Sequence, residues 1–167
     1  ETAEERTRID LKPERPNELV FLQQNGMLAT SDHAKVKFWN WQTGVSTTSD
    51  VAYHGFPRFS RNGRFIAIGT ADERVAVWDL MANRSIVKFT EHGIRTPRCG
   101  ISNDGSLVAA RDYRGSDRPL LVWDTRRGRR IRALTERRYY IADLVFSPNN
   151  RYLLVTGQVG EVKLRGG

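Results

Sequence analysis

The chain lacks the features that define several protein classes. It has a single cysteine, Cys99, so no disulfide can form within it and a disulfide scaffold is excluded. Its most apolar stretch, 65–69, has five residues, whereas a membrane-spanning helix needs about 20. The polar, acidic residues 1–5 do not show the basic-then-apolar pattern of a signal peptide. We therefore expect a reducing, cytoplasmic location, with the nucleus as the alternative.

The motifs of common enzyme classes are missing as well. The sequence has no Gly-x-Gly-x-x-Gly, no Gly-x-x-x-x-Gly-Lys, no Gly-x-Ser-x-Gly and no His-Glu-x-x-His. The three histidines, His33, His54 and His92, are far apart, and a metal site needs three or four convergent ligands. The sequence therefore predicts a protein that is not an enzyme, with no catalytic residues, no metal and no other cofactor.

Positive charge is concentrated in one part of the chain. The 167 residues include 27 lysines and arginines against 19 aspartates and glutamates, which gives a net charge of +8. Between Arg111 and Arg138, ten arginines stand against four acidic residues, so this segment carries +6. Arginine forms bidentate contacts with carboxylate and phosphate groups, although a GC-rich genome would also favour it. This segment is the first candidate for a binding surface.

A repeat of about 40 residues runs through the chain. Four short turn signals lie 37, 42 and 45 residues apart, each preceded by an apolar residue and followed by a run rich in Ile, Val and Leu. The signals are 24–26, 61–63, 103–105 and 148–150, the preceding residues are Leu22, Phe59, Ile101 and Phe146, and the runs are 27–30, 65–70, 107–110 and 152–156. Because Asn-Gly and Asp-Gly tolerate positive φ, the signals predict two-residue hairpin turns.

A second apolar run follows in each repeat. The runs are 35–39, 74–78 and 119–123, which end in Trp39, Trp78 and Trp123, and 161–165, which ends in Arg165. In each of the first three, two apolar residues at period two share one face, and the tryptophan lies on the other. Five residues after the tryptophans stand Gly44, Asn83 and Gly128, residue types that accept a left-handed turn.

Four copies of such a unit predict an all-β fold, a β-propeller of repeated four-stranded antiparallel blades, with about four blades in this chain. No segment shows the sustained apolar stripe of a helix. The expected blades are 17–54, 55–93, 94–137 and 138–167. Residues 1–16 form an N-terminal segment, in which 7–11 would supply the outer strand missing from the fourth blade of a closed ring.

Several motifs resemble those of the WD-repeat β-propeller family. They are Val77-Trp78-Asp79, Val122-Trp123-Asp124, Phe59-Ser60-Arg61-Asn62-Gly63 and Phe146-Ser147-Pro148-Asn149. The resemblance covers roughly residues 17 to 165 and is that of a divergent member. It implies a structural hydrogen-bond set in each blade. The set links the tryptophan to a strand Ser or Thr, to an Asp in the turn between the second and third strands, and to a His before the first strand.

The hydrogen-bond set that the resemblance implies is incomplete in every repeat. Asp72 and Asp117 each lie six residues before a tryptophan, and His92 lies nine residues before Ile101, as the family pattern requires. His54 is too close to the strand that follows it to fill the His position. At the Asp position, the first repeat has His33 and the fourth repeat has residues 158–160 without an aspartate. The missing members predict blades that are locked less firmly.

The number of blades leaves three arrangements open. Seven blades, the usual number in the family, would need about 290 residues, and this chain supplies about four blades. It is part of a longer propeller, a complete four-bladed ring, or one of two copies that form eight blades. Unpaired sheet edges need a partner, so we expect additional blades or self-association.

An arginine–tyrosine rim is the first candidate site. In the propeller family, the loops between second and third strands and those between blades share the rim that binds partners. The enlarged loop 111–118 and the connection 136–140 would place Arg and Tyr, both enriched at interaction hot spots, side by side there. The expected partner-binding residues are Tyr113, Arg114, Arg118, Arg137, Arg138, Tyr139 and Tyr140. The sequence thus predicts a scaffold for other proteins, with an acidic or phosphorylated segment as partner; a solvated rim without specific contacts is the alternative.

A run of arginines is the second candidate site. It consists of Arg126, Arg127, Arg129, Arg130 and Arg132, in the turn before the outer strand and in that strand. It would bind nucleic acid or another polyanion through its phosphates. It would otherwise serve as a nuclear-localisation-like cluster or protect the outer strand from edge pairing. A third functional hypothesis makes the chain a sensor or regulatory appendage of a larger enzyme.

Overall fold

The structure is a computed structural model that describes residues 16, 18–22, 26–31, 35–89, 93–95, 97–112, 119–134, 141–157 and 162–163. These residues form strands joined by turns, bends and irregular segments, and none of them is helical, so the all-β expectation is confirmed. None of the described segments is a helix of the length and apolar character that a bilayer crossing requires.

The strands form four antiparallel units that follow one another along the chain. The first contains β1 (Glu18–Leu22), β2 (Met27–Ser31), β3 (Lys35–Asn40) and β4 (Ser46–Ala52); the second β5 (His54–Phe59), β6 (Phe65–Gly69), β7 (Val75–Asp79) and β8 (Arg84–Lys88); the third β9 (Pro97–Ile101), β10 (Leu107–Asp112), β11 (Leu120–Asp124) and β12 (Arg129–Leu134); the fourth β13 (Ile141–Phe146), β14 (Leu153–Gly157) and β15 (Val162–Lys163). Within each unit, strands adjacent in sequence pair with each other. The prediction of repeated antiparallel propeller blades is confirmed.

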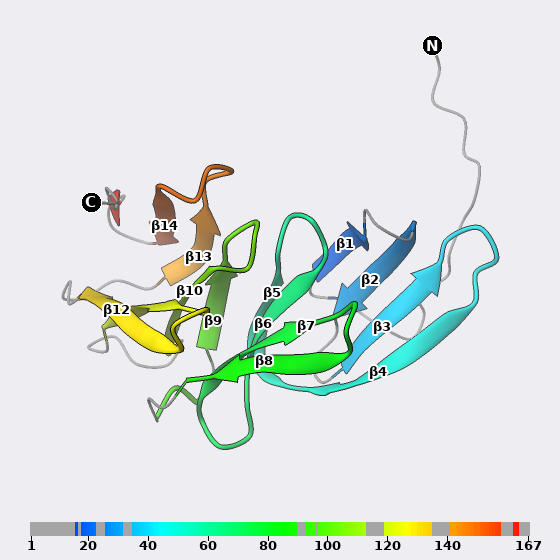
Figure 1. Cartoon of the computed structure of the whole chain (residues 1–167), viewed down its shortest axis with the longest axis horizontal. Helices are drawn as coiled ribbons and strands as arrows, with labels where there is room; N and C mark the ends of the chain where they lie inside the picture. Colours follow the sequence, from blue (N-terminus) through cyan, green and yellow to red (C-terminus); the bar gives the residue numbers. More distant parts are fainter. Residues whose placement is uncertain are drawn as a thin grey trace, which may run out of the picture.

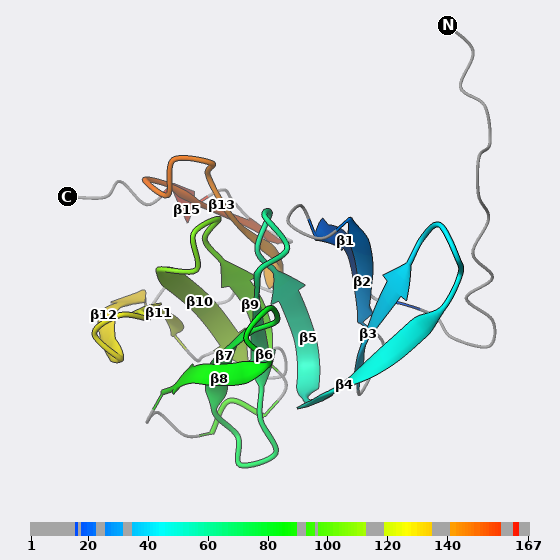
Figure 2. The same cartoon turned by 45° about the vertical axis from the view of Figure 1, so that its right-hand side comes forward.

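The four units stand beside one another. Their first strands, β1, β5, β9 and β13, lie in succession across the molecule, and a parallel pair between Phe56 and Arg98 joins β5 to β9 (Figure 1). The last strands β4, β8 and β12 lie at the edges of their sheets, toward the outside of the molecule, as a second view also shows (Figure 2). Each of the first three blades therefore runs from an inner first strand to an outer last strand.

An apolar core lies between each pair of successive blades. Val75 and Val77 of β7 pack with the third blade, in the same cluster as Trp123. Ala76 and Trp78 of the same strand pack with the first blade. A third cluster joins the third and fourth blades. The predicted alternation, with paired apolar residues on one face and tryptophan on the other, is confirmed, and it lets β7 and β11 each contribute to two cores.

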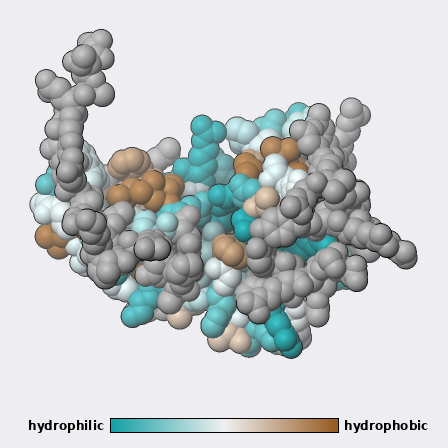
Figure 3. All heavy atoms as spheres, turned by 180° about the vertical axis from the view of Figure 1, so that it is seen from behind, coloured by the Kyte–Doolittle hydropathy of each residue, from teal (hydrophilic) through white to brown (hydrophobic). Residues whose placement is uncertain are grey.

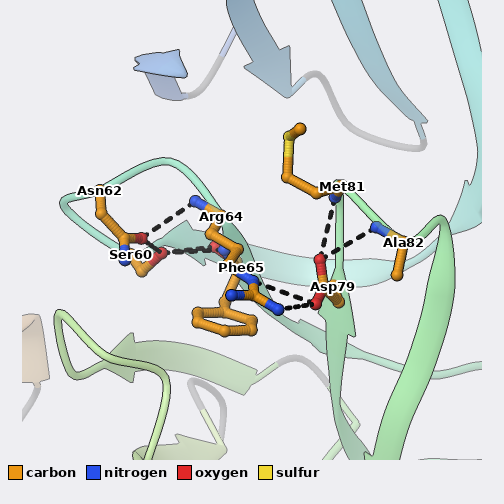
Figure 4. Close-up of polar contacts among 7 residues, drawn as sticks. All are labelled: Ser60, Asn62, Arg64, Phe65, Asp79, Met81 and Ala82. Atoms are coloured by element: carbon orange, nitrogen blue, oxygen red, sulfur yellow. Dashed lines mark hydrogen bonds and ion pairs between the residues drawn. The ribbon is translucent and has the colours of Figure 1, made fainter. Parts of the chain in front are cut away.

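The turns between first and second strands differ from the prediction. Four residues separate Ser60 from Phe65, whose backbone groups close the loop through a hydrogen bond from Ser60 N to Phe65 O of 2.8 Å. The hydroxyl of Ser60 accepts from Phe65 N and donates to Oδ1 of Asn62 (Figure 4). Of the residues of this loop, Gly63 alone has a positive φ, 72°. The expectation of two-residue turns was wrong because the Ser and Asn side chains bond the loop's own backbone, which favours a longer turn.

The same turn recurs in two further blades. Ser102 and Asp104 repeat the bonds of Ser60 and Asn62, and Ser147 and Asn149 do so again. In the last of these loops Asn150 takes the left-handed position, with a φ of 60°. Asparagine tolerates this conformation better than most residues, so the turn survives without glycine.

The turns that follow the tryptophans confirm the sequence prediction. Gly44, Asn83 and Gly128 have φ values of 73°, 47° and 62°. In the second blade Asp79 accepts hydrogen bonds from the backbone N–H groups of Met81 and Ala82 and pairs with Arg64 at 3.0 Å (Figure 4). Burial would raise the pKa of Asp79, but these donors outweigh it and lower the pKa. The aspartate that follows tryptophan thus caps the turn before the outer strand.

The outward faces of the first and last blades expose apolar side chains. Leu19 and Phe21 of β1 are exposed, as are Val145 and Leu154, a cross-strand pair of β13 and β14. Seen from behind, brown patches lie over the first and the last blade, with hydrophilic residues between them (Figure 3). The opposite faces of the same strands are buried against neighbouring blades.

Candidate functional site

The arginine–tyrosine rim lies outside the described residues. All seven of its predicted members belong to segments 113–118 and 135–140, namely Tyr113, Arg114, Arg118, Arg137, Arg138, Tyr139 and Tyr140. The strands that carry these segments are described, since β10 and β11 flank the first and β12 and β13 flank the second. One boundary is corrected: Arg111 and Asp112, expected in the loop, extend β10, and Arg111 is buried.

The arginine run lies where the third blade meets solvent. Arg126 and Arg127 belong to the turn after β11, and Arg129, Arg130 and Arg132 belong to β12; all five are exposed. The guanidinium of Arg127 pairs with Asp124 at 2.7 Å. The hydrogen bond from Arg127 N to Asp124 is the main reason why the pKa of Asp124 is lowered.

A pocket of about 400 Å³ adjoins the start of the arginine run. It is lined by Ser106, Leu107, Asp124, Arg126 and Arg127. The hydroxyl and the backbone N–H of Ser106 both donate to Asp104, so both donors of Ser106 already have an acceptor. Of the two arginines that line the pocket, Arg127 is paired with Asp124, so Arg126 is the lining cation whose charge faces solvent.

The structural hydrogen-bond set is present in part. Trp39 donates its indole N–H to Thr30 Oγ1 at 2.9 Å in the first blade, as the resemblance implies. In the second blade the buried indole N–H of Trp78 has no acceptor among the described residues, because Ile68 occupies the position of Thr30 relative to the tryptophan. Trp123 of the third blade stacks on Phe89 with ring centroids 4.9 Å apart.

Asp72 has local partners in the second blade. It accepts from Thr70 Oγ1 at 2.5 Å and from Lys88 Nζ at 3.0 Å, and these bonds lower its pKa to about 2.

The other expected members of the structural hydrogen-bond set, Asp117, His92 and His33, lie outside the described residues. His54, whose spacing did not fit the His position of the family, is the first residue of β5 and is exposed.

Replacing Thr30 by valine tests whether the Trp39 bond stabilises the first blade. Valine keeps the shape but removes the acceptor, which leaves a buried indole N–H unsatisfied. We expect the free energy of unfolding to fall by about 1–3 kcal/mol, measured by chemical denaturation. Thr30→Ser keeps the acceptor and should cost less. An equal or greater loss with serine would show that the methyl group, not the hydrogen bond, matters.

A charged cluster links three inner strands. Arg58 of β5 lies between Glu18 of β1, 3.0 Å away, and Asp143 of β13, with which it also forms a hydrogen bond. Glu18 accepts a second bond from Phe59 N at 2.9 Å. The partners of Arg58 are 40 and 85 residues away in sequence. Sequence reasoning missed this cluster because no local motif contains any of its three side chains.

Burial shapes the electrostatics of this cluster. Burial raises the pKa of Glu18, and the attraction of Arg58 offsets this only in part. The cluster borders a pocket of about 370 Å³ whose other lining is largely apolar, with Ile101 and Phe146 among its residues. Arg58 therefore holds the first and fourth blades to the second by neutralising a carboxylate on each side.

Cys99 and the acidic residues give no sign of a reactive or metal site. Cys99 lies in β9, inside the core between the second and third blades, which confirms its prediction as a small core residue. Burial raises the pKa of its thiol to about 12, so the nucleophilic thiolate is not populated at neutral pH. Among the residues whose placement is described, no three His, Cys, Asp or Glu side chains cluster as metal ligands would.

Known proteins resemble this chain over part of their length. The family model for the WD domain, G-beta repeat, matches residues 45–79. Nuclear distribution protein PAC1 of Arthroderma benhamiae is 24% identical, over 84% of this chain and 33% of that protein. WD repeat and SOCS box-containing protein 1 of Homo sapiens is 25% identical, over 65% of this chain and 25% of that protein. WD repeat-containing protein 70 of Xenopus laevis is 34% identical, over 59% and 16%.

A solved structure has the same fold. Hydrazine Synthase of Kuenenia stuttgartiensis superimposes with a TM-score of 0.65 at 19% identity, over 92% of this chain and 45% of that one. This chain spans about a third or less of the curated relatives named above. Residues 45–79 thus match a WD repeat, and the chain as a whole consists of β-propeller blades that are similar to those of WD-repeat proteins.

Proposed function

We propose that this chain is a non-catalytic scaffold that presents a rim of fixed loops to protein partners. Proteins with WD40 repeats commonly act as interaction scaffolds. The observation that carries the proposal is the series of blades with a buried apolar core between each successive pair. A rigid frame of this kind holds loops in place, so little conformational entropy is lost when a partner binds.

The contact residues that we propose are those of the arginine–tyrosine rim. Two connections of the third blade carry these residues. Segment 113–118 connects β10 to β11, and segment 135–140 connects β12 to β13 of the fourth blade. Their arginines offer bidentate hydrogen bonds to carboxylate or phosphate, and their tyrosines offer large contact areas with a polar end. An acidic or phosphorylated protein segment is the partner that fits this chemistry.

Charge reversal on the rim tests this proposal. We expect Arg114→Glu combined with Arg138→Glu to reduce partner capture from native lysate at least about tenfold, since it turns attraction into repulsion. The melting temperature should stay the same. Arg61→Glu with Arg151→Glu is the matched control, because both arginines are exposed in turns between first and second strands.

The capture experiment is run with and without nuclease. Protein partners that survive nuclease and disappear with the rim reversal support the scaffold. Unchanged capture by the reversed variant would remove the rim from the proposal. Partners that are lost only on nuclease treatment would identify a nucleic-acid-binding protein instead, and the scaffold proposal would be wrong.

A further inference from the structure

Two outer strands form an exposed surface. β8 of the second blade and β12 of the third each end a sheet and lie on the outside of the molecule (Figures 1 and 2). They approach each other where the turn before β12 meets β8: a Cβ placed on Gly128 would lie 3.7 Å from a methyl carbon of Val87. We call β8, β12 and the turn 125–128 the outer-strand surface.

Several arginines on this surface have no acidic partner among the residues that the structure describes. Four exposed side chains there, Arg84, Arg126, Arg129 and Arg132, form no ion pair with the described part of the chain. Arg127 and Lys88 are neutralised by Asp124 and Asp72. The corresponding outer strand of the first blade, β4, contains neither lysine nor arginine. Of the three outer strands that the structure describes, β8 and β12 therefore carry this positive charge and β4 does not.

An exposed isoleucine accompanies the arginines on each strand. Ile86 and Ile131 are 45% and 43% exposed. Both stand at a shift of the strand register, since Trp78 pairs with Ser85 and Val77 with Val87, and the third blade repeats this around Ile131. The repeat thus places an apolar side chain at the same point of each outer strand, next to arginine.

The register shift decides how a partner would bind. A bulge bends and twists an edge strand, and charged side chains on the edge discourage another strand from pairing with it. Addition of a partner strand by backbone hydrogen bonds is therefore disfavoured. Recognition depends on the side chains, which combine exposed guanidinium groups with an apolar contact.

This combination fits an acidic protein segment better than a nucleic acid. Neither β8 nor β12 contains an aromatic residue on which a base could stack. An isoleucine gives a phosphodiester backbone no favourable contact, whereas a protein segment can bury an apolar side chain against it. We propose that the outer-strand surface binds an acidic protein segment in which carboxylates alternate with apolar side chains. This inference rests on the proposed scaffold function and assigns it a second binding surface.

Binding of short labelled peptides tests the inference. The probe is a peptide of alternating glutamate and valine, compared with one of glutamate and serine and with single-stranded oligothymidylate. Arg129→Gln with Arg132→Gln should weaken the glutamate–valine peptide about tenfold, because two charge-assisted contacts are lost. Ile131→Ser should weaken it about threefold. The control Arg61→Gln with Arg151→Gln removes the same charge elsewhere and should change affinity less than about twofold.

Several outcomes would overturn the inference. Equal losses in the two arginine pairs would show that only net charge matters, and equal binding of the glutamate–serine peptide would remove the apolar contact. Tighter binding of oligothymidylate, lost in Arg129→Gln with Arg132→Gln, would assign the surface to nucleic acid. If peptides fail to bind while the native protein still captures partners through the rim, this inference alone is wrong; loss of all capture would contradict the scaffold itself.

Discussion

Replacing Arg58 by methionine is expected to lower the free energy of unfolding at neutral pH by about 2–3 kcal/mol. Methionine keeps the length of the side chain but leaves Glu18 and Asp143 without their shared cation. Removing one partner of a fully buried ion pair costs about 3–5 kcal/mol, and the partial exposure of this cluster reduces that figure. Chemical denaturation followed by circular dichroism measures the loss.

The pH dependence of the Arg58→Met variant identifies the cause. The folded-state pKa of Glu18 lies above its ordinary value of 4.5, so the stability this group contributes is complete below that pH and is lost as pH rises through the folded pKa. Without Arg58 the pKa of Glu18 rises further, and the loss becomes larger near neutrality. We therefore expect the difference between native and variant protein to shrink at pH about 4.

A double variant provides the control. Glu18→Gln added to Arg58→Met removes the uncompensated charge while Gln still accepts from Phe59 N. Part of the lost stability should return at neutral pH, and the pH dependence should weaken. A pH-independent loss that the second substitution does not relieve would mean that Arg58 acts through packing alone.

Replacing Trp123 by alanine is expected to lower the free energy of unfolding by about 3–5 kcal/mol, more than the loss of Arg58 does. Trp123 is completely buried between the second and third blades, and its ring stacks on Phe89 at an angle of 16°. Alanine leaves a cavity in the core that these blades share. The midpoint of chemical denaturation should fall sharply.

Two matched variants distinguish the contribution of the Trp123–Phe89 ring stack to stability from the effect of losing any tryptophan. Trp123→Phe keeps an aromatic ring against Phe89 and should cost clearly less than alanine. Trp41→Ala removes a tryptophan from the turn after β3, outside the three apolar clusters, and should cost less than about 1 kcal/mol. Similar losses at both tryptophans would contradict a special role for the core between the second and third blades.

The strand pattern was largely predictable from the sequence. Trp39, Trp78 and Trp123 end alternating runs that are strands in the structure, and the residues five positions later adopt left-handed turns. Alternation along a strand and the need for Gly or Asn at positive φ are local effects, so they are visible in a few consecutive residues. The loops built on Ser60, Ser102 and Ser147 were mispredicted because side-chain bonds to the backbone compete with tight turns.

Side-chain partners were much less predictable. The resemblance implied that each tryptophan would bond a strand hydroxyl, yet Trp78 has Ile68 in that place, which only the register between β6 and β7 makes evident. The arginines near β12 were visible as a run of charge. Within the described part of the chain, however, Arg127 has an acidic partner whereas Arg129 and Arg132 have none, and this depends on which groups lie within reach. A charge pattern does not contain that information.

The sequence by itself determined the repeat, the all-β class, the place of each tryptophan turn and the concentration of arginine near the third blade. These follow from short-range periodicity and composition, which need no knowledge of contacts between distant residues. Only the tertiary structure decided that Arg58 lies between Glu18 and Asp143, and that Gly128 brings the turn before β12 against β8. Such contacts arise when blades pack through their apolar faces, and the distance between their residues in sequence leaves no local trace of them.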